Sequence, residues 1–328
     1  MKPRAALTLL VTGFLSFCPV IRAAAYTFTT IDVLNSSSTV ALGINDVGQI
    51  VGLYSGPPPS PSGQHGFLEA NGVFTTIDPP GSPQTLASDI DNAGQIVGSY
   101  VSTSPFTHFA DYLDENGVFT TFGPPPGGGF AGADGPHINN AGQIVGSFNE
   151  QSDFAGRGFL YENGVFTTIS VPGAANNTVG GINDSGEIVG SYTDSRGNFL
   201  GYLDDNGVFT TIDIPGGGNI FTTGINNAGQ IVGYYQDSSA VWHGFVDNNG
   251  NLITIDTPGA FPSVGGGTYT GGINNAGQVV GYYFDNDRVE HGFLATPVPE
   301  PASLLLLTSG LAGIVILIVR RRMARTRA

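Results

Sequence analysis

Two short blocks alternate along most of the chain, and this repetition constrains the fold more than any other feature of the sequence. The first block reads "GINDVGQIVG" at Gly43, and successive copies begin 43 to 48 residues apart. The six copies start at Gly43, Asp89, His137, Gly181, Gly224 and Gly272. A repeat of this length indicates units that stack on one another to bury their apolar faces.

The second block lies between copies of the first and reads "GFLEANGVFTTID" at Gly66. Complete copies start at Gly66, Asp111, Gly158, Gly201 and Gly244, and a sixth begins with "GFLAT" at Gly292 and then stops. Asn-Gly in the centre of this block readily adopts the positive φ angles of a tight hairpin. In the first block, "NNAG" or a variant predicts a slightly longer hairpin loop whose Asn or Asp side chain binds the turn backbone. Each unit therefore predicts two hairpins, or four strands.

Four strands in about 45 residues match one blade of a β-propeller. The segment "YTFTTID" at Tyr26–Asp32 matches the strand that the truncated sixth unit lacks. If it pairs beside Gly292–Thr296, the first and last units form one blade and the ring closes without open edges. We therefore predict an all-β, six-bladed β-propeller over residues 26–296. A β-solenoid is the alternative, although it offers no reason to divide one unit between the termini.

The recurrent strand "GVFTTI" has no plainly polar face. Val73, Thr75 and Ile77 lie on one side, and Phe74 and Thr76 lie on the other. A sheet with one solvated side normally alternates more clearly between apolar and polar residues. We therefore expect neighbouring blades to cover both faces.

The N-terminus has the features of a signal peptide over residues 1–25. Lys2 and Arg4 precede an apolar run over residues 5–20. The small residues Ala23, Ala24 and Ala25 predict cleavage by signal peptidase after Ala25. A lipoprotein modified at Cys18 is the alternative, but the bulky Phe17 suits a lipid-attachment motif poorly. Cys18 is the only cysteine, so the exported domain contains no disulfide and depends on burial for stability.

The C-terminus predicts a membrane span. Ala302–Val319 contains no charged residue, and as a helix of about 27 Å it just crosses a hydrocarbon core of about 30 Å. Arg320, Arg321 and Arg322 follow directly and form a stop signal that keeps the basic tail in the cytoplasm. The sequence thus predicts a protein anchored in a membrane by this segment. A buried core helix is the alternative that the arginines disfavour.

Residues 297–328 resemble the PEP-CTERM sorting signal, because Val298, Pro299, Glu300 and Pro301 precede the apolar segment and the terminal arginine cluster. The resemblance implies a substrate of an exosortase, a membrane protease-transferase of Gram-negative bacteria that also make extracellular polysaccharide. It implies that Val298–Pro301 is the recognition and processing region and that the helix is a temporary anchor in the inner membrane before sorting. The protein would then reach the cell surface or extracellular matrix. A permanent single-pass tether is the alternative.

The repeats also resemble the extracellular HAF family. The eponymous triplet is present as "HGF" in three copies, which start at His65, His243 and His291. Other copies depart at the first position, where Ala110, Arg157 and Leu200 are found. The resemblance implies a secreted structural class without an established activity.

Charge excludes one class of partner. Between Asp32 and Glu300 the chain has 26 acidic residues and three basic ones, a net charge of 3 − 26 = −23. Such a domain repels phosphate backbones, so we predict that it does not bind nucleic acid.

The sequence contains no recognisable catalytic motif, since G-x-S-x-G, H-E-x-x-H and phosphate-binding loops do not occur. The five histidines are His65, His108, His137, His243 and His291. Three of them share one repeat position, where we expect strand-start histidines beside phenylalanine in preference to metal ligands. Asp285, Asp287 and Glu290 form the best candidate for calcium, but such cations require six or more oxygen ligands. We therefore predict no catalytic residues, no metal ligands and no cofactor, with calcium as the one possibility left open.

Two functions remain on this evidence. The first is a non-enzymatic surface or matrix protein that associates with exopolysaccharide through its acidic propeller. The alternative is a glycan-active enzyme, a lyase or hydrolase, with a carboxylate pair in the central channel. Trp242 and the 12 tyrosines could stack on sugars, although aromatic residues also fill blade cores. Short loops of Gly, Pro, Ser and Asp favour the first function.

Overall fold

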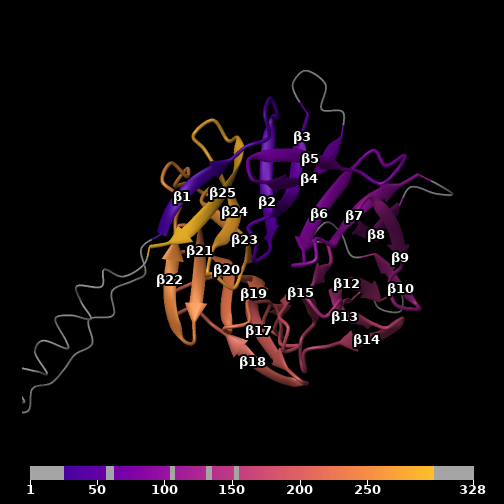
Figure 1. The fold of residues 1–328 in the computed structure, drawn as a ribbon. Coiled ribbons are helices and arrows are strands. Elements are labelled where there is room, and N and C mark those ends of the chain that lie inside the picture. Colours follow the sequence, from indigo (N-terminus) through magenta and orange to yellow (C-terminus); the bar gives the residue numbers. More distant parts are fainter. Residues whose placement is uncertain (1–25, 57–62, 104–107, 131–134, 151–154, 299–328) are drawn as a thin grey trace, which may run out of the picture.

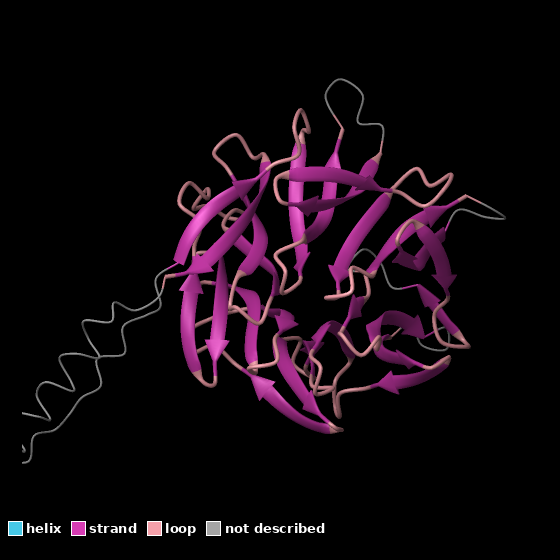
Figure 2. Cartoon of the chain, in the orientation of Figure 1, coloured by secondary structure: helices cyan, strands magenta, loops and turns pink. Residues whose placement is uncertain are grey.

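Six four-stranded units form a closed ring in the computed structural model, which describes residues 26–56, 63–103, 108–130, 135–150 and 155–298. Within these residues the regular elements are strands (Figure 2). Each sheet is antiparallel, and in five of the six blades the strands follow chain order from the ring axis outwards, whereas the outermost strand of the sixth comes from the N-terminus (Figure 1). The predicted six-bladed propeller is confirmed, and the solenoid is excluded.

The first three blades follow one another along the chain. Blade 1 contains β2 (Ser38–Ile44), β3 (Ile50–Ser55), β4 (Gln64–Ala70) and β5 (Val73–Ile77). Blade 2 contains β6 (Thr85–Ile90), β7 (Ile96–Ser102), β8 (His108–Glu115) and β9 (Val118–Phe122). Blade 3 contains β10 (Gly128–Phe130), β11 (His137–Ile138), β12 (Ile144–Glu150), β13 (Gly156–Glu162) and β14 (Val165–Ile169). Its inner position is divided between β10 and β11, which both pair with β12.

The last three blades repeat this arrangement. Blade 4 contains β15 (Asn176–Ile182), β16 (Ile188–Thr193), β17 (Phe199–Asp205) and β18 (Val208–Ile212). Blade 5 contains β19 (Ile220–Ile225), β20 (Gln230–Gln236), β21 (Trp242–Asn248) and β22 (Asn251–Ile255). Blade 6 contains β23 (Thr268–Ile273), β24 (Val279–Phe284), β25 (Glu290–Pro297) and β1 (Tyr26–Ile31).

The N-terminal strand closes the ring. β1 pairs antiparallel with β25 over its whole length, from Tyr26 opposite Pro297 to Ile31 opposite Gly292. The two strands lie side by side in Figure 1 although they come from opposite ends of the described chain. This confirms the prediction that the first and last repeat units share one blade.

The hairpin turns of the second block have the predicted geometry. Asn71 and Gly72 have φ angles of 54° and 81°, and the other Asn-Gly pairs have similar values. Positive φ at both central residues gives the turn the twist that joins two right-twisted strands directly.

Each blade packs an aromatic ring over a glycine of the preceding strand. A Cβ added to Gly52 on β3 would lie 2.8 Å from the Phe67 ring of β4, so only glycine fits beneath that ring. The equivalent rings are almost completely buried in all six blades. They are Phe67, Tyr112, Phe159, Tyr202, Phe245 and Phe293. The "IVG" of the first block and the aromatic residue of the second are thus two halves of one contact.

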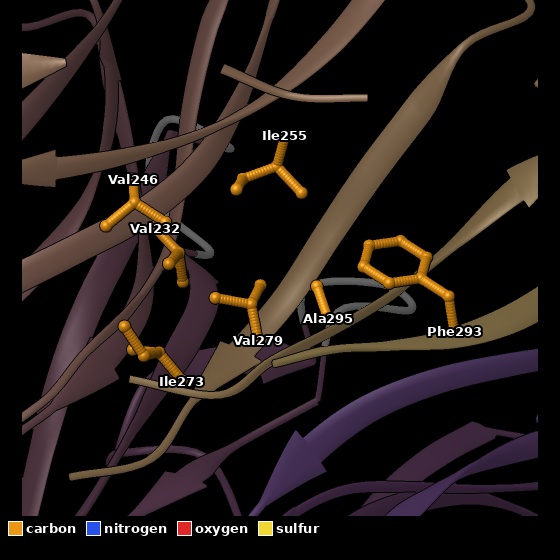
Figure 3. Close-up of a cluster of buried hydrophobic side chains, with 7 residues drawn as sticks. All are labelled: Val232, Val246, Ile255, Ile273, Val279, Phe293 and Ala295. Atoms are coloured by element: carbon orange, nitrogen blue, oxygen red, sulfur yellow. The ribbon is translucent and has the colours of Figure 1, made fainter. Parts of the chain in front are cut away.

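The hydrophobic core lies between adjacent blades. Figure 3 shows one such cluster, formed by strands of blades 5 and 6. Its buried members are Val232, Val246, Ile255, Ile273, Val279, Phe293 and Ala295. Because each blade buries its faces against its neighbours, no blade has a core of its own.

The outer strands differ from expectation. We expected both faces of "GVFTTI" to be covered, but Val73 is 64% exposed, and Thr75 and Thr76 are also exposed. Ile77 is buried and Phe74 is half-buried. The outer strand has no further strand beside it, and neighbouring blades lie further apart at this distance from the axis. Only its last residue, Ile77, is therefore fully covered.

Candidate functional site

The two ends of the central channel are built from different parts of the repeat. The first-block turns, such as Asn45–Gly48, follow the inner strands and surround one end. The loops between second and third strands of blades 4, 5 and 6 lie at the other end, together with the described connections between blades. We call the end surrounded by the first-block turns the narrow mouth, and the opposite end the wide mouth.

Each turn at the narrow mouth is held by its first Asn or Asp. The Gln49 backbone N–H donates to Asn45 Oδ1 at 2.9 Å, and the Asn45 side-chain amide donates to Gln49 Oε1 at 2.7 Å. This confirms the prediction that the Asx side chain binds the turn backbone.

A closed ring of six hydrogen bonds joins these turns. The Asp46 backbone N–H donates to Asn92 Oδ1 in the next blade at 2.8 Å, and the pattern continues around the axis with distances of 2.8 to 2.9 Å. It closes where the Asn275 N–H donates to Asp46 Oδ1. The six residues are Asp46, Asn92, Asn140, Asp184, Asn227 and Asn275. The second Asx of each first block therefore links neighbouring blades.

A second ring is complete at five of its six positions. Asn45 Nδ2 donates to the Asp91 carbonyl at 2.9 Å, and Asn274 Nδ2 donates to the Asn45 carbonyl at 3.1 Å. Asn139, Asn183 and Asn226 make the corresponding bonds. Asp91 occupies the sixth position, and an ionised carboxylate has no proton to donate.

The narrow mouth encloses only about 70 Å³, lined by these turn residues and the isoleucines that precede them. Burial by itself raises the pKa of Asp46, but hydrogen bonds from Asn92 and Asn275 outweigh burial and lower the pKa. Asparagine amides lower the pKa of Asp184 in the same way. Both carboxylates already accept several hydrogen bonds, so the narrow mouth acts as a lock between blades.

The wide mouth opens into a cavity of about 450 Å³, which is lined from all six blades. A β-bulge in the inner strand contributes to it: the register shifts between Ala41 and Gly43, and the extra residue, Leu42, lines the cavity. Ser88 and Thr223 occupy equivalent bulges. Bulges commonly redirect a side chain in this way. This volume falls in the range of small-molecule sites.

Aromatic side chains cover one arc of this cavity. Phe221, Tyr234 and Tyr282 line it from blades 5 and 6. The rings of Tyr269 and Tyr282 are stacked with centroids 4.8 Å apart, and Tyr269 lies 5.1 Å from Tyr234. Trp242 supports the group from outside the cavity lining, with its ring 5.4 Å from that of Tyr234. The result is an aromatic wall on one side of the channel, and leucines of blades 1 and 2 also line the cavity.

The two wall tyrosines occupy one variable repeat position, directly after "IVG" or "VVG". Blades 5 and 6 carry tyrosine there, blade 1 carries leucine, and three blades carry serine. The serines are Ser99, Ser147 and Ser191. We did not predict a role for this position from the sequence, although aligning the six copies shows that the residue type varies there.

Glu290 is the carboxylate of the wide mouth. It lies at the start of β25 and lines the cavity with Tyr282 of the adjacent strand. Burial raises its pKa, and a hydrogen bond with Ser38 offsets part of that effect. Among the described lining residues there is no lysine or arginine.

The repeated histidines lie near the rim of the wide-mouth face and pair with aspartates. Nδ1 of His65 is 2.7 Å from Asp78 Oδ2, and the ring stacks against Tyr54 at 5.4 Å. His243 and His291 have the same two kinds of neighbour, Asp256 with Tyr235 and Asp32 with Tyr283. We expected phenylalanine neighbours, but tyrosine and aspartate occupy those positions. The remaining histidines are separate: His137 lies 3.7 Å from Asp89, and His108 begins β8.

The calcium candidates do not converge. Asp285 Oδ1 accepts the backbone N–H groups of Asp287 and Val289, and its Oδ2 lies 3.3 Å from His291 Nε2. Glu290 instead faces the cavity. In the described part of the chain, no group of three or more His, Cys, Asp or Glu residues could hold a metal ion.

The targeting residues lie mostly outside the described structure. Ala23–Ala25, Pro299–Pro301 and Arg320–Arg322 are not among the described residues, and Val298 is the last residue that is. Over the described ranges, no helix has the length and hydropathy to cross a membrane. The predicted span, Ala302–Val319, falls outside those ranges and stays a prediction.

Comparison with known families identifies the C-terminal segment. Residues 297–322 match the PEP-CTERM protein-sorting motif. The motif implies an exported protein that an exosortase processes. It covers only the C-terminal end of the chain, and the HAF resemblance of the repeats remains an expectation. No curated protein matches the sequence.

Several solved structures are similar to the chain. TolB from Acinetobacter baumannii has a TM-score of 0.50 and 14% identity, over 80% of this chain and 64% of TolB, so the chain spans less than two thirds of that protein. The lectin of Aleuria aurantia, a six-bladed β-propeller, has a TM-score of 0.47 and 10% identity over 84% of this chain and 99% of its own. A gluconolactonase from Xanthomonas campestris has a TM-score of 0.48 and 11% identity over 84% and 90%. At such identities the likeness extends to the fold alone.

Proposed function

We propose that this chain is a non-enzymatic protein of the cell surface or extracellular matrix, sorted by an exosortase, whose propeller binds exopolysaccharide at the wide mouth. The observation that carries the proposal is the aromatic wall of Phe221, Tyr234 and Tyr282 along a cavity of about 450 Å³. The apolar faces of sugar rings pack on aromatic rings, while their hydroxyls bind polar groups nearby. Gln64, Ser88 and Thr270 supply such groups in the same cavity.

The repeats themselves provide a test of this site. Tyr234→Ser combined with Tyr282→Ser places in blades 5 and 6 the residue that three other blades carry at that position, so the fold should tolerate it. We expect the double variant to lose at least about tenfold in affinity for the producer's exopolysaccharide, since stacking on two rings is lost. Titration calorimetry measures the change.

Tyr235→Phe combined with Tyr283→Phe is the matched control. These tyrosines are the next residues along the same strands and stack on His243 and His291, away from the cavity. The control should bind like the wild type. Equal affinity of the serine variant and the wild type for the polysaccharide would refute the proposed site.

The sorting step has its own test. Replacing Val298–Pro301 by alanines should leave the protein in the inner membrane fraction, because the recognition region of the exosortase is lost. Fractionation followed by immunoblotting measures its location. Release of the variant to the cell surface at the wild-type level would contradict exosortase processing at these residues.

A glycan-active enzyme is the second candidate, and Glu290 is the observation that favours it. A half-buried carboxyl group with a raised pKa beside a sugar-sized cavity suits a general acid. If the protein is such an enzyme, incubation with the polysaccharide should generate new chain ends, and Glu290→Gln should abolish them. Size-exclusion chromatography of the treated polysaccharide distinguishes cleavage from binding alone.

A further inference from the structure

The charge distribution of the wide mouth is one-sided. Glu290 is its one carboxylate among the described lining residues, and neither lysine nor arginine lines it. Two of the three basic residues of the propeller are engaged elsewhere: Arg157 Nε lies 3.7 Å from Glu150, and the Arg288 guanidinium lies over the Phe261 ring. Apart from Glu290 and the two tyrosines, His137 is the titratable group among the described lining residues. Its Nδ1 lies 3.7 Å from Asp89 Oδ2. The described part of the lining thus offers one carboxylate and neither lysine nor arginine.

Glu290 and the aromatic wall lie on the same arc. Glu290 begins β25 directly opposite Phe284 of β24, two residues beyond the wall residue Tyr282. Tyr234 reaches the cavity from the adjacent blade. A carboxylate beside aromatic faces is a combination that attracts an organic ammonium group, because the negative face of each ring and the carboxylate act on the same cation. Partial removal from water strengthens both attractions.

We propose that the wide mouth selects sugar residues that bear a free amino group, with Glu290 pairing with the ammonium and Tyr234 and Tyr282 contacting the sugar ring. This inference rests on the proposed glycan binding and specifies its ligand class. A uronic acid polymer would bring carboxylates against Glu290 without a cation to receive them. A neutral or N-acetylated sugar would stack on the wall without gaining anything from the carboxylate.

The experiment compares two probes that differ only at nitrogen: a glucosamine tetramer and the same tetramer fully N-acetylated. The full chain, purified in detergent, is titrated with each by calorimetry at pH 6, where the amine is largely protonated. We expect the glucosamine tetramer to bind about tenfold more tightly, the effect of one ammonium group on a partly desolvated carboxylate and aromatic face. Glu290→Gln should abolish that preference and leave the N-acetylated tetramer unaffected.

Glu187→Gln is the matched control. Glu187 lies at the narrow mouth, where its carboxylate accepts from Asn183 Nδ2, and five other repeats carry glutamine at this position. The control removes the same charge from the same protein without touching the wide mouth. It should keep the full preference for the amine, which separates a local effect of Glu290 from the overall field.

The outcomes separate this inference from the proposed function. Equal affinity for the two tetramers, or a preference that survives Glu290→Gln, overturns amine selection while glycan binding stands. Chemical N-acetylation of the producer's polysaccharide gives a second readout, because it should reduce binding of the wild type to the level of Glu290→Gln. If neither the tetramers nor the polysaccharide bind, the proposed function itself is wrong.

Discussion

His291 Nδ1 lies 2.8 Å from Asp32 Oδ2, which joins two residues that are 259 positions apart in the chain. Asp32 directly follows the N-terminal strand β1, and His291 lies on β25, so the pair spans the seam that closes the ring. The second ring nitrogen of His291, Nε2, lies 3.3 Å from Asp285 Oδ2. A single imidazole therefore links the N-terminal strand, β25 and the preceding loop.

This seam should be sensitive to pH near neutrality. Burial by itself lowers the pKa of His291, but hydrogen bonds and charge from Asp32 and Asp285 outweigh it and raise the pKa. A histidine whose pKa is raised on folding contributes stability that is present below its unfolded pKa of about 6.5 and is lost as pH rises through the folded value. The stability difference between wild type and His291→Gln should therefore shrink from pH 6 to pH 8.5. Urea unfolding measures it.

His243→Gln is the control for that prediction. His243 forms the equivalent contact with Asp256, but both residues belong to blade 5. Limited proteolysis should release the N-terminal segment faster in His291→Gln than in His243→Gln. Equal release from the two variants would mean that the His291 contact does not hold the seam.

Deleting residues 26–32 should lower the melting temperature of the whole ring. The deletion removes buried Ile31 and uncovers β25, including Phe293, which is fully buried. From the apolar burial lost, we expect a decrease of about 5 to 10 °C in a single cooperative transition. Thr27→Ala with Thr29→Ala keeps the strand and changes only exposed side chains, so it should melt like the wild type. An unchanged melt after the deletion would disprove closure through β1.

Gly52→Ala should destabilise the protein by about 3 kcal/mol or more. The new Cβ would lie 2.8 Å from the Phe67 ring and would also overlap the Val40 carbonyl, both within blade 1. Gly123→Ala is the control, because no heavy atom lies within 4 Å of its added Cβ. Chemical denaturation should separate the two variants clearly, and equal midpoints would contradict the proposed glycine and aromatic contact.

Asp91→Asn should complete the second ring of hydrogen bonds at the narrow mouth. The new Nδ2 can donate to the Asn139 carbonyl as its equivalents do in five repeats, for a gain of about 1 kcal/mol. Burial also raises the pKa of Asp91, so removing its charge adds to the gain at neutral pH. Asn226→Asp makes the reverse change and should destabilise, since it removes the bond to the Asn274 carbonyl. A loss of stability in Asp91→Asn would contradict this account.

Asp111 should make stability fall as pH rises. Burial raises its pKa from 3.8 to about 6, although the Ser99 hydroxyl donates to it at 2.6 Å. When folding raises the pKa of a carboxyl group, the folded state keeps the proton up to a higher pH than the unfolded state does. Stability therefore decreases between pH 4 and 6 and stays at the lower value above pH 6. Asp111→Asn should therefore stabilise by up to about 3 kcal/mol above pH 7 and by about half as much at pH 5. Asp213→Asn, at an exposed position, should change stability by less than about 0.5 kcal/mol. A gain for Asp111→Asn that does not depend on pH would contradict this prediction.

Much of the fold was predictable because each repeat contains residues that mark its turns. Asn71-Gly72 and its equivalents predicted tight hairpins from their positive φ preference, and the structure has them. The spare "YTFTTID" predicted closure, and β1 pairs with β25. The prediction that both faces of the outer strand are covered was wrong. Alternation along a strand indicates which residues share a face, but it does not indicate whether another blade covers that face.

The residues of the proposed binding site were harder to predict. Tyr234 and Tyr282 are ordinary tyrosines in the sequence, and only the ring geometry brings them into one cavity with Glu290. Trp242 was considered for sugar stacking, but it supports the wall from outside the lining. The histidines that share a repeat position stay on separate blades, as a ring requires of equivalent residues.

The sequence by itself determined the number of blades, the position of the seam and the sorting motif, because each depends on local patterns that recur or stand at a chain end. Only the tertiary structure decided how the two mouths differ. In a ring, one residue per repeat becomes a neighbour of its equivalents near the axis. The Asx residues of the narrow mouth meet there as a hydrogen-bonded lock, and the variable position of blades 5 and 6 forms an aromatic wall beside Glu290.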